Sequence, residues 1–343
     1  MSLGCNGTAG ARTDACVTTP DCQPPAPLNV PWVTPYFLIT TPQRCGSHMM
    51  TNLLNVGAGG QIHSGGESAL LKVRSPTFAS FLCRLRRQLE LDHSRHASVP
   101  PVISGFISHA NGIGAYADQF ARWTRDYGKV KVLDGRRAAV MAISDNYLAN
   151  AANAQLGGHV SNPRADASIH ETYFNLTAHN RLPVTEALAE AIRQYEGYAY
   201  RSVEEVQRIT GGRPPHGSGS TLFTPTASAW LRASGLLYRY NYEDLIIADS
   251  REEHLGAIFK FLLGANSSVA RAMAATAFRS TDARAASIGQ MILTLHPPTC
   301  SSRVTDWAAL RPMINGTYTQ RACDRLEREF GKGGRRLARV YDA

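Results

Sequence analysis

The chain has 343 residues, of which 43% are hydrophobic and 18% are charged, and its formal net charge is +9. This apolar content supports a folded core and excludes general disorder, and the lack of an uncharged apolar run of about 18 residues excludes a membrane-spanning helix from the chain as given. The basic excess favours an anionic partner, but the Lys and Arg residues are scattered, so charge alone does not separate nucleic acid from nucleotide or sulfated glycan.

Residues 1–30 differ in composition from the rest of the chain. They are rich in Gly, Thr, Pro and Cys and show no hydrophobic periodicity. From residue 31 onward we find neither an internal repeat nor a linker. The sequence therefore predicts an irregular leader over 1–30 and a single domain over 31–343.

Short apolar runs alternate with helical patterns in this domain. The runs YFLIT, PPVISGF and GKVKVLDG are typical of strands that are buried on both faces. Helical patterns follow in SHMMTNLLNVG, in RRAAVMAISDNYLANAANAQLGG, over 183–212 and over 250–264, where Gly264 ends the last of them. Because parallel strands need long crossover connections, the alternation predicts an α/β fold: a single-domain parallel β-sheet flanked by helices.

The junction between the first strand and its helix has the chemistry of an anion site. Backbone N–H groups and the positive end of a helix converge at such a turn. Arg44 adds a cation, Gly46 permits close approach, and Ser47 places a hydroxyl at the start of the helix. An ordinary turn with Ser47 as the helix cap is the alternative. A Walker A loop is excluded, because the G-x-x-x-x-G-K-[ST] pattern is absent.

A second basic residue, Arg136, follows the third predicted strand, and Ser144 lies on the next helix. A guanidinium supplies charge and paired donors, and a hydroxyl adds a directed hydrogen bond, so the two suit a dianionic phosphate. The alternative is that Arg136 is a solvated residue at the start of the helix.

The stretch TPQRCGSHMM resembles the 5′-phosphosulfate loop of the sulfotransferase family. Arg44 falls on the basic position of the family, Cys45 on its usual Ser, Gly46 on its Gly and Ser47 on its hydroxyl residue. His48 departs from the usual Thr. The resemblance implies a P-loop NTPase-like sulfotransferase fold, in which these five residues bind the donor 3′-phosphoadenosine 5′-phosphosulfate (PAPS).

Three further segments carry the same resemblance. Arg136 and Ser144 are similar to the family's signature for the 3′-phosphate of the donor. The stretch from YEDL to FLG resembles a structural segment beside the nucleotide, so we expect Tyr242, Glu243 and Asp244 to be scaffold. SSRVTDWAALRPMINGT resembles a segment of the bacterial-type and carbohydrate-type members.

The resemblance implies sulfuryl transfer from PAPS to a hydroxyl or amine, without a metal. Arg44, Ser47 and nearby backbone amides would stabilise the leaving group. Glu67, which we place in a Gly-rich loop after the first helix, and His109, after the second predicted strand, are the candidate catalytic bases. We favour Glu67 over His109, and His63 is a third choice.

The acceptor is expected to be a small molecule or a glycan. We expect no nucleic-acid partner, since the basic clusters lack interleaved aromatic residues and no nucleic-acid-binding motif is present. Two alternatives stay open: a catalytically inactive nucleotide- or glycan-binding protein on the same fold, and a nucleotide kinase. The oligomeric state is open as well.

Cysteines and asparagines leave the compartment open between the cytoplasm and the secretory route. Cys300 and Cys323 could form a disulfide or remain thiols. Four N-x-[ST] sequons fit a secretory route, but such tripeptides also arise by chance; they begin at Asn6, Asn175, Asn266 and Asn315.

Overall fold

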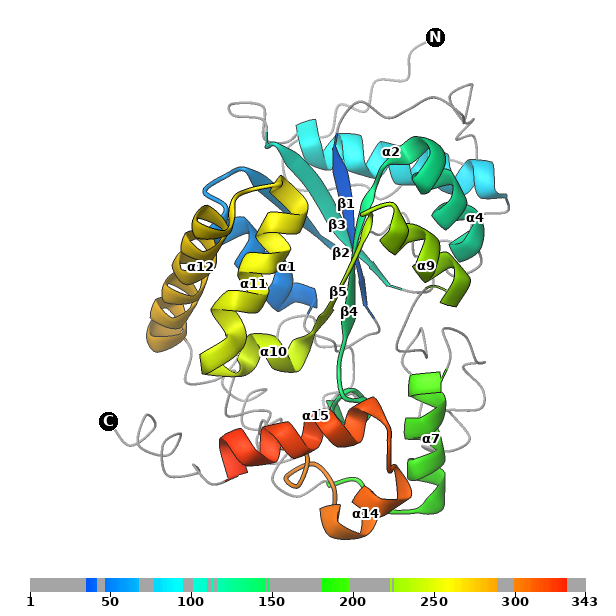
Figure 1. The fold of residues 1–343 in the computed structure, drawn as a ribbon, viewed down its shortest axis with the longest axis vertical. Helices are drawn as coiled ribbons and strands as arrows, with labels where there is room; N and C mark the ends of the chain where they lie inside the picture. Colours follow the sequence, from blue (N-terminus) through cyan, green and yellow to red (C-terminus); the bar gives the residue numbers. More distant parts are fainter. Residues whose placement is uncertain are drawn as a thin grey trace, which may run out of the picture.

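Five parallel strands form the centre of the molecule (Figure 1); the sequence predicts the parallel sheet but not the strand that contains Glu67. The computed structural model describes residues 35–41, 47–67, 77–94, 101–109, 113, 116–145, 147, 181–197, 223, 225–288 and 299–331. The strand order is β2-β3-β1-β4-β5. The strands are β1 (Tyr36–Thr41), β2 (Ile62–Glu67), β3 (Ile103–His109), β4 (Lys131–Arg136) and β5 (Leu237–Asn241).

The central strand β1 is buried along its whole length, which explains why its sequence is continuously apolar rather than alternating. Its neighbours are β3 on one side and β4 on the other. The contact with β3 requires a glycine, because a Cβ atom on Gly105 would lie 2.3 Å from the carbonyl oxygen of Phe37. The spacing between these strands therefore depends on a residue without a side chain.

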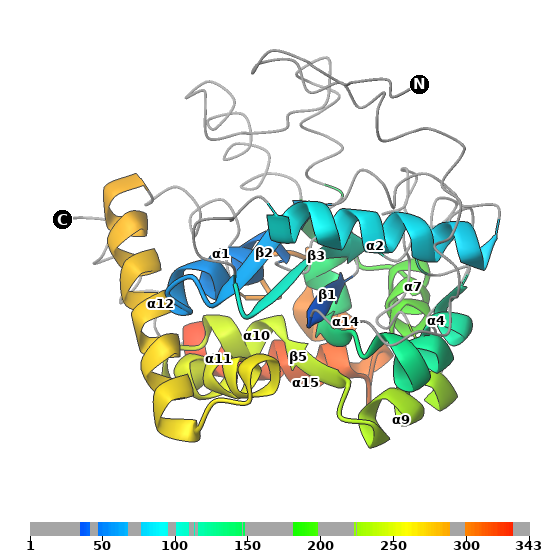
Figure 2. The ribbon, with the colours of Figure 1, turned by 90° about the horizontal axis from the view of Figure 1, so that it is seen from above.

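Helices cover both faces of the sheet (Figures 1 and 2). One face of the sheet is covered by α1 (Ser47–Gly57), α11 (Ala248–Leu263) and α12 (Ser267–Ile288). These helices share an apolar core with the β1 side chains that point to this face, such as Phe37. The other face is covered by α2 (Phe78–Ser94), α4 (Ala117–Trp123), the π-helix η3 (Thr124–Gly128) and α9 (Pro225–Ala233). The core on this side includes Leu38 and Phe120. The alternation of apolar side chains along β1 thus divides the core into two layers.

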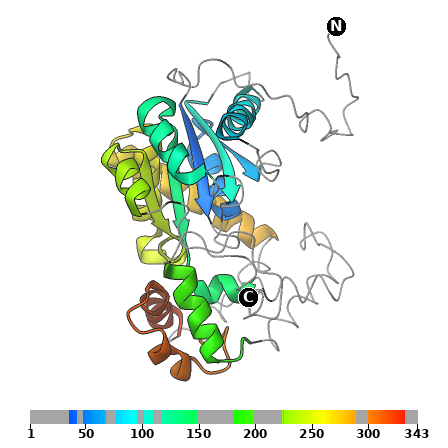
Figure 3. The same ribbon diagram turned by 90° about the vertical axis from the view of Figure 1, so that its right-hand side faces the viewer.

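A third group of helices lies beyond the carboxyl ends of the strands (Figures 1 and 3). We call it the C-terminal lobe; it comprises the helical residues 139–145, α7 (Glu186–Gly197), α14 (Trp307–Met313), α15 (Tyr318–Leu326) and the π-helix η4 (Glu327–Gly331). Its apolar core is separate from the two sheet layers. The short helix α10 (Tyr242–Ile246) connects β5 to α11. The lobe therefore stands where parallel α/β proteins bind their ligands.

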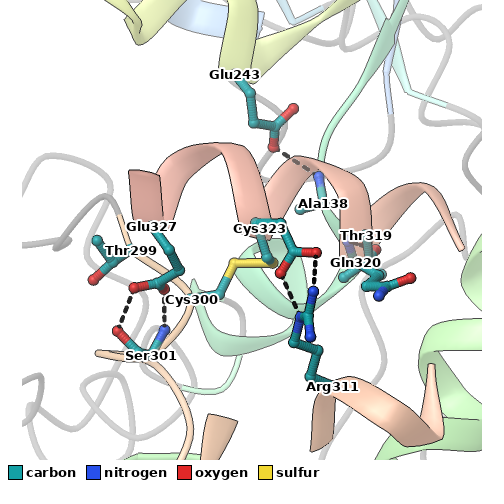
Figure 4. Close-up of a disulfide and its surroundings, with 12 residues drawn as sticks. Ala138, Glu243, Thr299, Cys300, Ser301, Arg311, Thr319, Gln320, Cys323 and Glu327 are labelled. Carbon is teal, nitrogen blue, oxygen red and sulfur yellow. Dashed lines mark hydrogen bonds and ion pairs between the residues drawn. A yellow bond between two sulfur atoms is a disulfide. The ribbon is translucent and has the colours of Figure 1, made fainter. Parts of the chain in front are cut away.

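A disulfide bond joins Cys300 to Cys323 inside this lobe and settles the question that the sequence left open. Both cysteines are fully buried. The disulfide ties the segment after residue 298 to the helix α15 (Figure 4).

One sequence expectation about the fold is wrong. We expected Glu67 in a Gly-rich loop, but residues Ile62–Glu67 form the edge strand β2, whose register shifts between Ser64 and Glu67. The Asn55 side chain of α1 holds this strand, donating to the Ser64 carbonyl at 2.9 Å and accepting from its N–H at 2.7 Å. The small residues of IHSGGE carry no apolar run that would reveal a strand.

Other expectations fall partly outside the described ranges. The predicted leader over 1–30 lies there entirely. The helix predicted over 183–212 is described only as Glu186–Gly197. Within the ranges that the structure describes, no helix combines the length and apolarity needed to span a bilayer.

Candidate functional site

The predicted donor-binding elements meet at the carboxyl edge of the sheet. Strand β1 ends at Thr41 and α1 begins at Ser47, which is buried. The neighbouring strand β4 runs in parallel, with Asp134 opposite Thr40, and it ends at Arg136. The connection over 42–46, which holds Arg44, Cys45 and Gly46, lies outside the described residues. The described end of β1 lies beside the end of β4.

The two candidate bases are the last residues of two neighbouring strands, β2 and β3, at the carboxyl ends of the sheet. His109 is the last residue of β3 and pairs with Thr41 of β1. Glu67 is the last residue of β2 and pairs with Ile107. With strands about 4.8 Å apart, the backbone at His109 is one strand spacing from β1, and the backbone at Glu67 is about 10 Å away. The side chains of Glu67, His109 and His48 are outside the described part of the structure.

Arg136 is held by the C-terminal lobe. Its guanidinium lies over the ring of Tyr318, 4.0 Å from the ring centroid. Its Nη2 atom is 4.0 Å from Oε2 of Glu196, which is beyond hydrogen-bond distance, and 21% of its side chain is exposed. The Nε atom is buried and has no hydrogen-bond partner among the described residues. Arg136 therefore has one hydrogen-bond donor that the described part of the protein does not use.

Burial and the neighbouring charge shift the pKa of Arg136 in opposite directions. Burial lowers the pKa of its guanidinium, and the Glu196 carboxylate partly offsets this. Arginine pKa values are so high that the side chain stays protonated. The site therefore carries a partly desolvated positive charge, whose interaction with an anion is stronger than at a fully solvated surface.

The carboxylate of Glu196 accepts hydrogen bonds from the first residues of α15. It accepts a hydrogen bond from the N–H of Tyr318 at 2.6 Å and another from the N–H of Thr319. A carboxylate at a helix N-terminus is favoured by the helix dipole. Glu196 thus fixes α15, and with it the Tyr318 ring, beside Arg136.

Glu243 connects the same helix to the end of β4. It is buried, accepts from the N–H of Ala138 at 2.8 Å and accepts from the hydroxyl of Tyr318 at 2.6 Å (Figure 4 shows the first of these). The N–H of Ala139 donates to Oγ1 of Thr319 at 2.7 Å. Burial raises the pKa of Glu243. Through these contacts Glu243 joins the start of the segment after β4 to α15.

Ser144 lies on the helical segment 139–145 and is 1% exposed. The next residue, Asp145, accepts a hydrogen bond from Nη1 of Arg137 at 2.6 Å and one from Nη1 of Arg303. Arg137 also lies over the ring of Tyr242, 4.5 Å from its centroid. These buried ion pairs fix the segment that carries Ser144. Sequence reasoning missed Arg303, since no local pattern connects residues 158 positions apart.

A further ion pair, which is partly buried, joins β4 to β5 near the carboxyl ends of the strands. Arg239 of β5 contacts Asp134 of β4, with its Nη2 2.8 Å from Oδ2. Thr40 donates its hydroxyl to Oδ1 of Asp134 at 3.4 Å. Burial raises the pKa of Asp134, although Arg239 opposes the shift. Asp134 and Arg239 thus compensate each other's charge at 2.8 Å, whereas the Glu196 carboxylate lies 4.0 Å from Arg136.

Neither a metal cluster among the described residues nor a match to a family model or a curated protein identifies the site. Among the described residues, no group of three or more His, Cys, Asp or Glu side chains is placed to hold a metal ion. No family model matches the sequence, and no curated protein matches it either. The likeness to sulfotransferases therefore rests on the motif residues in the sequence alone.

Proposed function

We propose that the chain is a sulfotransferase that transfers a sulfuryl group from PAPS to a hydroxyl or amine of an acceptor. The supporting observation is that β1, which ends at Thr41, and β4, which ends at Arg136, are adjacent parallel strands that end at the same edge of the sheet. The chain leaves β1 for one face of the sheet, through α1, and leaves β3 for the other, through α4. Ligands of parallel α/β sheets bind where connections diverge in this way.

Arg136 fits the role of holding the 3′-phosphate of the donor. A dianionic phosphate needs a cation with unused donors, and Arg136 offers a buried Nε without a partner in the described region. Tyr318 restricts the guanidinium from one side, so less side-chain freedom is lost when a ligand binds. Ser144 would add a hydroxyl donor from the neighbouring helix.

The start of α1 fits the opposite end of the donor. This helix has no acidic residue in its first turn, so its own side chains do not neutralise its positive end. The amides at 46–48, the Ser47 hydroxyl and Arg44 would stabilise the phosphate oxygen that departs from sulfur.

The reaction requires one bond to form and one to break. The acceptor oxygen or nitrogen bonds to sulfur, the bond between sulfur and the bridging phosphate oxygen breaks, and 3′-phosphoadenosine 5′-phosphate leaves. The acceptor loses a proton to a base, for which Glu67 and His109 are the candidates. By analogy with phosphoryl transfer, positioning and charge stabilisation supply most of the catalysis.

A binding titration tests the 3′-phosphate site. We expect 3′-phosphoadenosine 5′-phosphate to bind more tightly than adenosine 5′-phosphate, and Arg136→Ala to remove this preference. Hydrogen bonds to charged groups contribute about 1.5–3 kcal/mol, so we expect a loss of about 10- to 150-fold. Arg311→Ala is the matched control, because Arg311 is an exposed arginine of the same lobe, paired with Asp324. Equal binding of the two nucleotides by the folded wild type would contradict the proposal.

A sulfuryl-transfer assay tests the reaction itself. We expect Arg44→Ala to abolish donor-dependent sulfonation, and a comparison of Glu67→Gln with His109→Asn to identify the base. Cys45 and His48 depart from the sulfotransferase pattern, and these departures favour an inactive nucleotide-binding protein as the second candidate. Tight donor binding without turnover over a broad acceptor panel would support that candidate. Binding of ATP with magnesium instead of the 3′-phosphorylated nucleotide would support a kinase.

A further inference from the structure

The buried disulfide indicates where the chain folds. Cys300 and Cys323 are bonded within the core of the C-terminal lobe, and Cys83 of α2 is also disulfide-bonded. Disulfides form and persist in oxidising compartments and are rare in a reducing cytosol. Folding in an oxidising lumen also exposes a chain to N-glycosylation, so the sequons become informative.

The sequon at Asn315 occupies an exposed turn. Asn315 and Gly316 are exposed between α14 and α15, and Gly316 has a φ of +78°, in the left-handed region that glycine adopts readily. Thr317 follows as the N-cap of α15; its hydroxyl oxygen accepts from the N–H of Gln320 at 3.1 Å. A glycan on Asn315 would extend into solvent without disturbing this cap.

The sequon at Asn266 lies in another exposed turn, between α11 and α12. Its side-chain oxygen Oδ1 accepts from the Ser268 hydroxyl at 2.8 Å and from the N–H of Val269 at 3.0 Å. The amide of the acceptor asparagine and the hydroxyl two residues later are thus in contact, which are the two groups that define a sequon. Asn266 and Ser268 are both exposed.

We infer that Asn266 and Asn315 are N-glycosylation sites of a chain that folds in an oxidising lumen. Chance sequons also fall inside helices and strands, whereas both described ones occupy exposed turns before a helix, in a chain with a buried disulfide. The glycan donor is a lipid-linked oligosaccharide pyrophosphate. Nδ2 forms a bond to the anomeric carbon, the bond from that carbon to the pyrophosphate breaks, and Nδ2 loses one proton. This inference is independent of the proposed sulfotransferase activity.

Peptide mapping of the full chain from its native cells tests the inference. Digestion with a peptide N-glycosidase in heavy-oxygen water converts each glycosylated Asn to labelled Asp, and a non-reduced digest reports the disulfide. We expect label at both Asn266 and Asn315, together with a linked peptide containing Cys300 and Cys323. Unmodified asparagine at both positions would overturn the inference, and label at only one would overturn it for the other.

Matched variants of the full chain, secreted from eukaryotic cells, test each site separately. We expect Asn315→Gln and Asn266→Gln each to remove one glycan from the intact mass. Ser268→Ala should remove the glycan at Asn266 while the asparagine stays in place. Asn52→Gln is the control, because Asn52 is exposed but belongs to no sequon, and it should leave the mass of the glycans unchanged. Loss of no glycan in the first three variants would contradict the assignment.

Discussion

Removing the Cys300–Cys323 disulfide should destabilise the folded chain by several kcal/mol. The two cysteines are separated by 23 positions in the sequence. In the chain-entropy model, closing a loop of this length stabilises the folded state by about 3.4 kcal/mol. Both cysteines are fully buried, so the double variant Cys300→Ala/Cys323→Ala removes the cross-link without exposing new groups at the surface.

Urea unfolding of the full chain, followed by circular dichroism, measures this loss. We expect the free energy of unfolding to fall by about 3.4 kcal/mol in the double variant. Val269→Ala is the control, since Val269 is 43% exposed, and it should change stability by about 0.5 kcal/mol or less. A double variant within about 1 kcal/mol of the wild type would refute the argument that the cross-link restricts the unfolded chain.

Removing the disulfide should also affect the candidate site, because the disulfide holds the helix that contacts Arg136. Cys323 lies on α15, whose first residue, Tyr318, packs against Arg136. We therefore expect the double variant to lose affinity for the 3′-phosphorylated nucleotide as well, even at urea-free conditions where it is folded. The wild type should keep its disulfide in a mild reductant until it unfolds, because both cysteines are inaccessible to solvent.

Two further substitutions test the buried charges. Burial raises the pKa of Glu243, so its contribution to stability is present below the ordinary carboxyl pKa and is lost as the pH rises through the folded pKa. Glu243→Gln should therefore cost more stability at pH 5 than at pH 8 in urea titrations, and parallel pH profiles for variant and wild type would contradict this reasoning. Asp145→Asn removes the carboxylate that both Arg137 and Arg303 contact and should cost about 3–5 kcal/mol. The control Asp324→Asn, at a partly exposed carboxylate that pairs with the exposed Arg311, should have a much smaller effect, and equal losses in the two variants would argue against the buried charge cluster.

The fold was largely predictable because its signals are local. The apolar runs of β1, β3 and β4 and the helical pattern that ends at Gly264 all coincide with observed elements. Gly264 adopts a φ of +67° as the residue that ends α11, as the sequence predicts. Burial on both faces of the sheet imposes these patterns directly on the chain.

The position of Glu67 shows where local signals fail. Strand β2 is an edge strand made of small and polar residues, and it is held by Asn55 and by pairing with β3. The conformation of such a segment depends on its neighbours rather than on its own apolar pattern, so its sequence predicts a loop. The sequence therefore predicts a loop at Glu67, whereas the structure places it at the end of a strand.

The sequence alone determined the alternation of strands and helices, and it named Arg136 and Ser144 as candidate phosphate-binding residues. Only the tertiary structure decided that Arg136 lies between Tyr318 and Glu196, and that Glu243 joins the end of β4 to α15. Strand and helix periods repeat over a few residues, so they can be read from the chain. Glu243 and Ala138 are 105 positions apart, and only the folded chain brings such residues together.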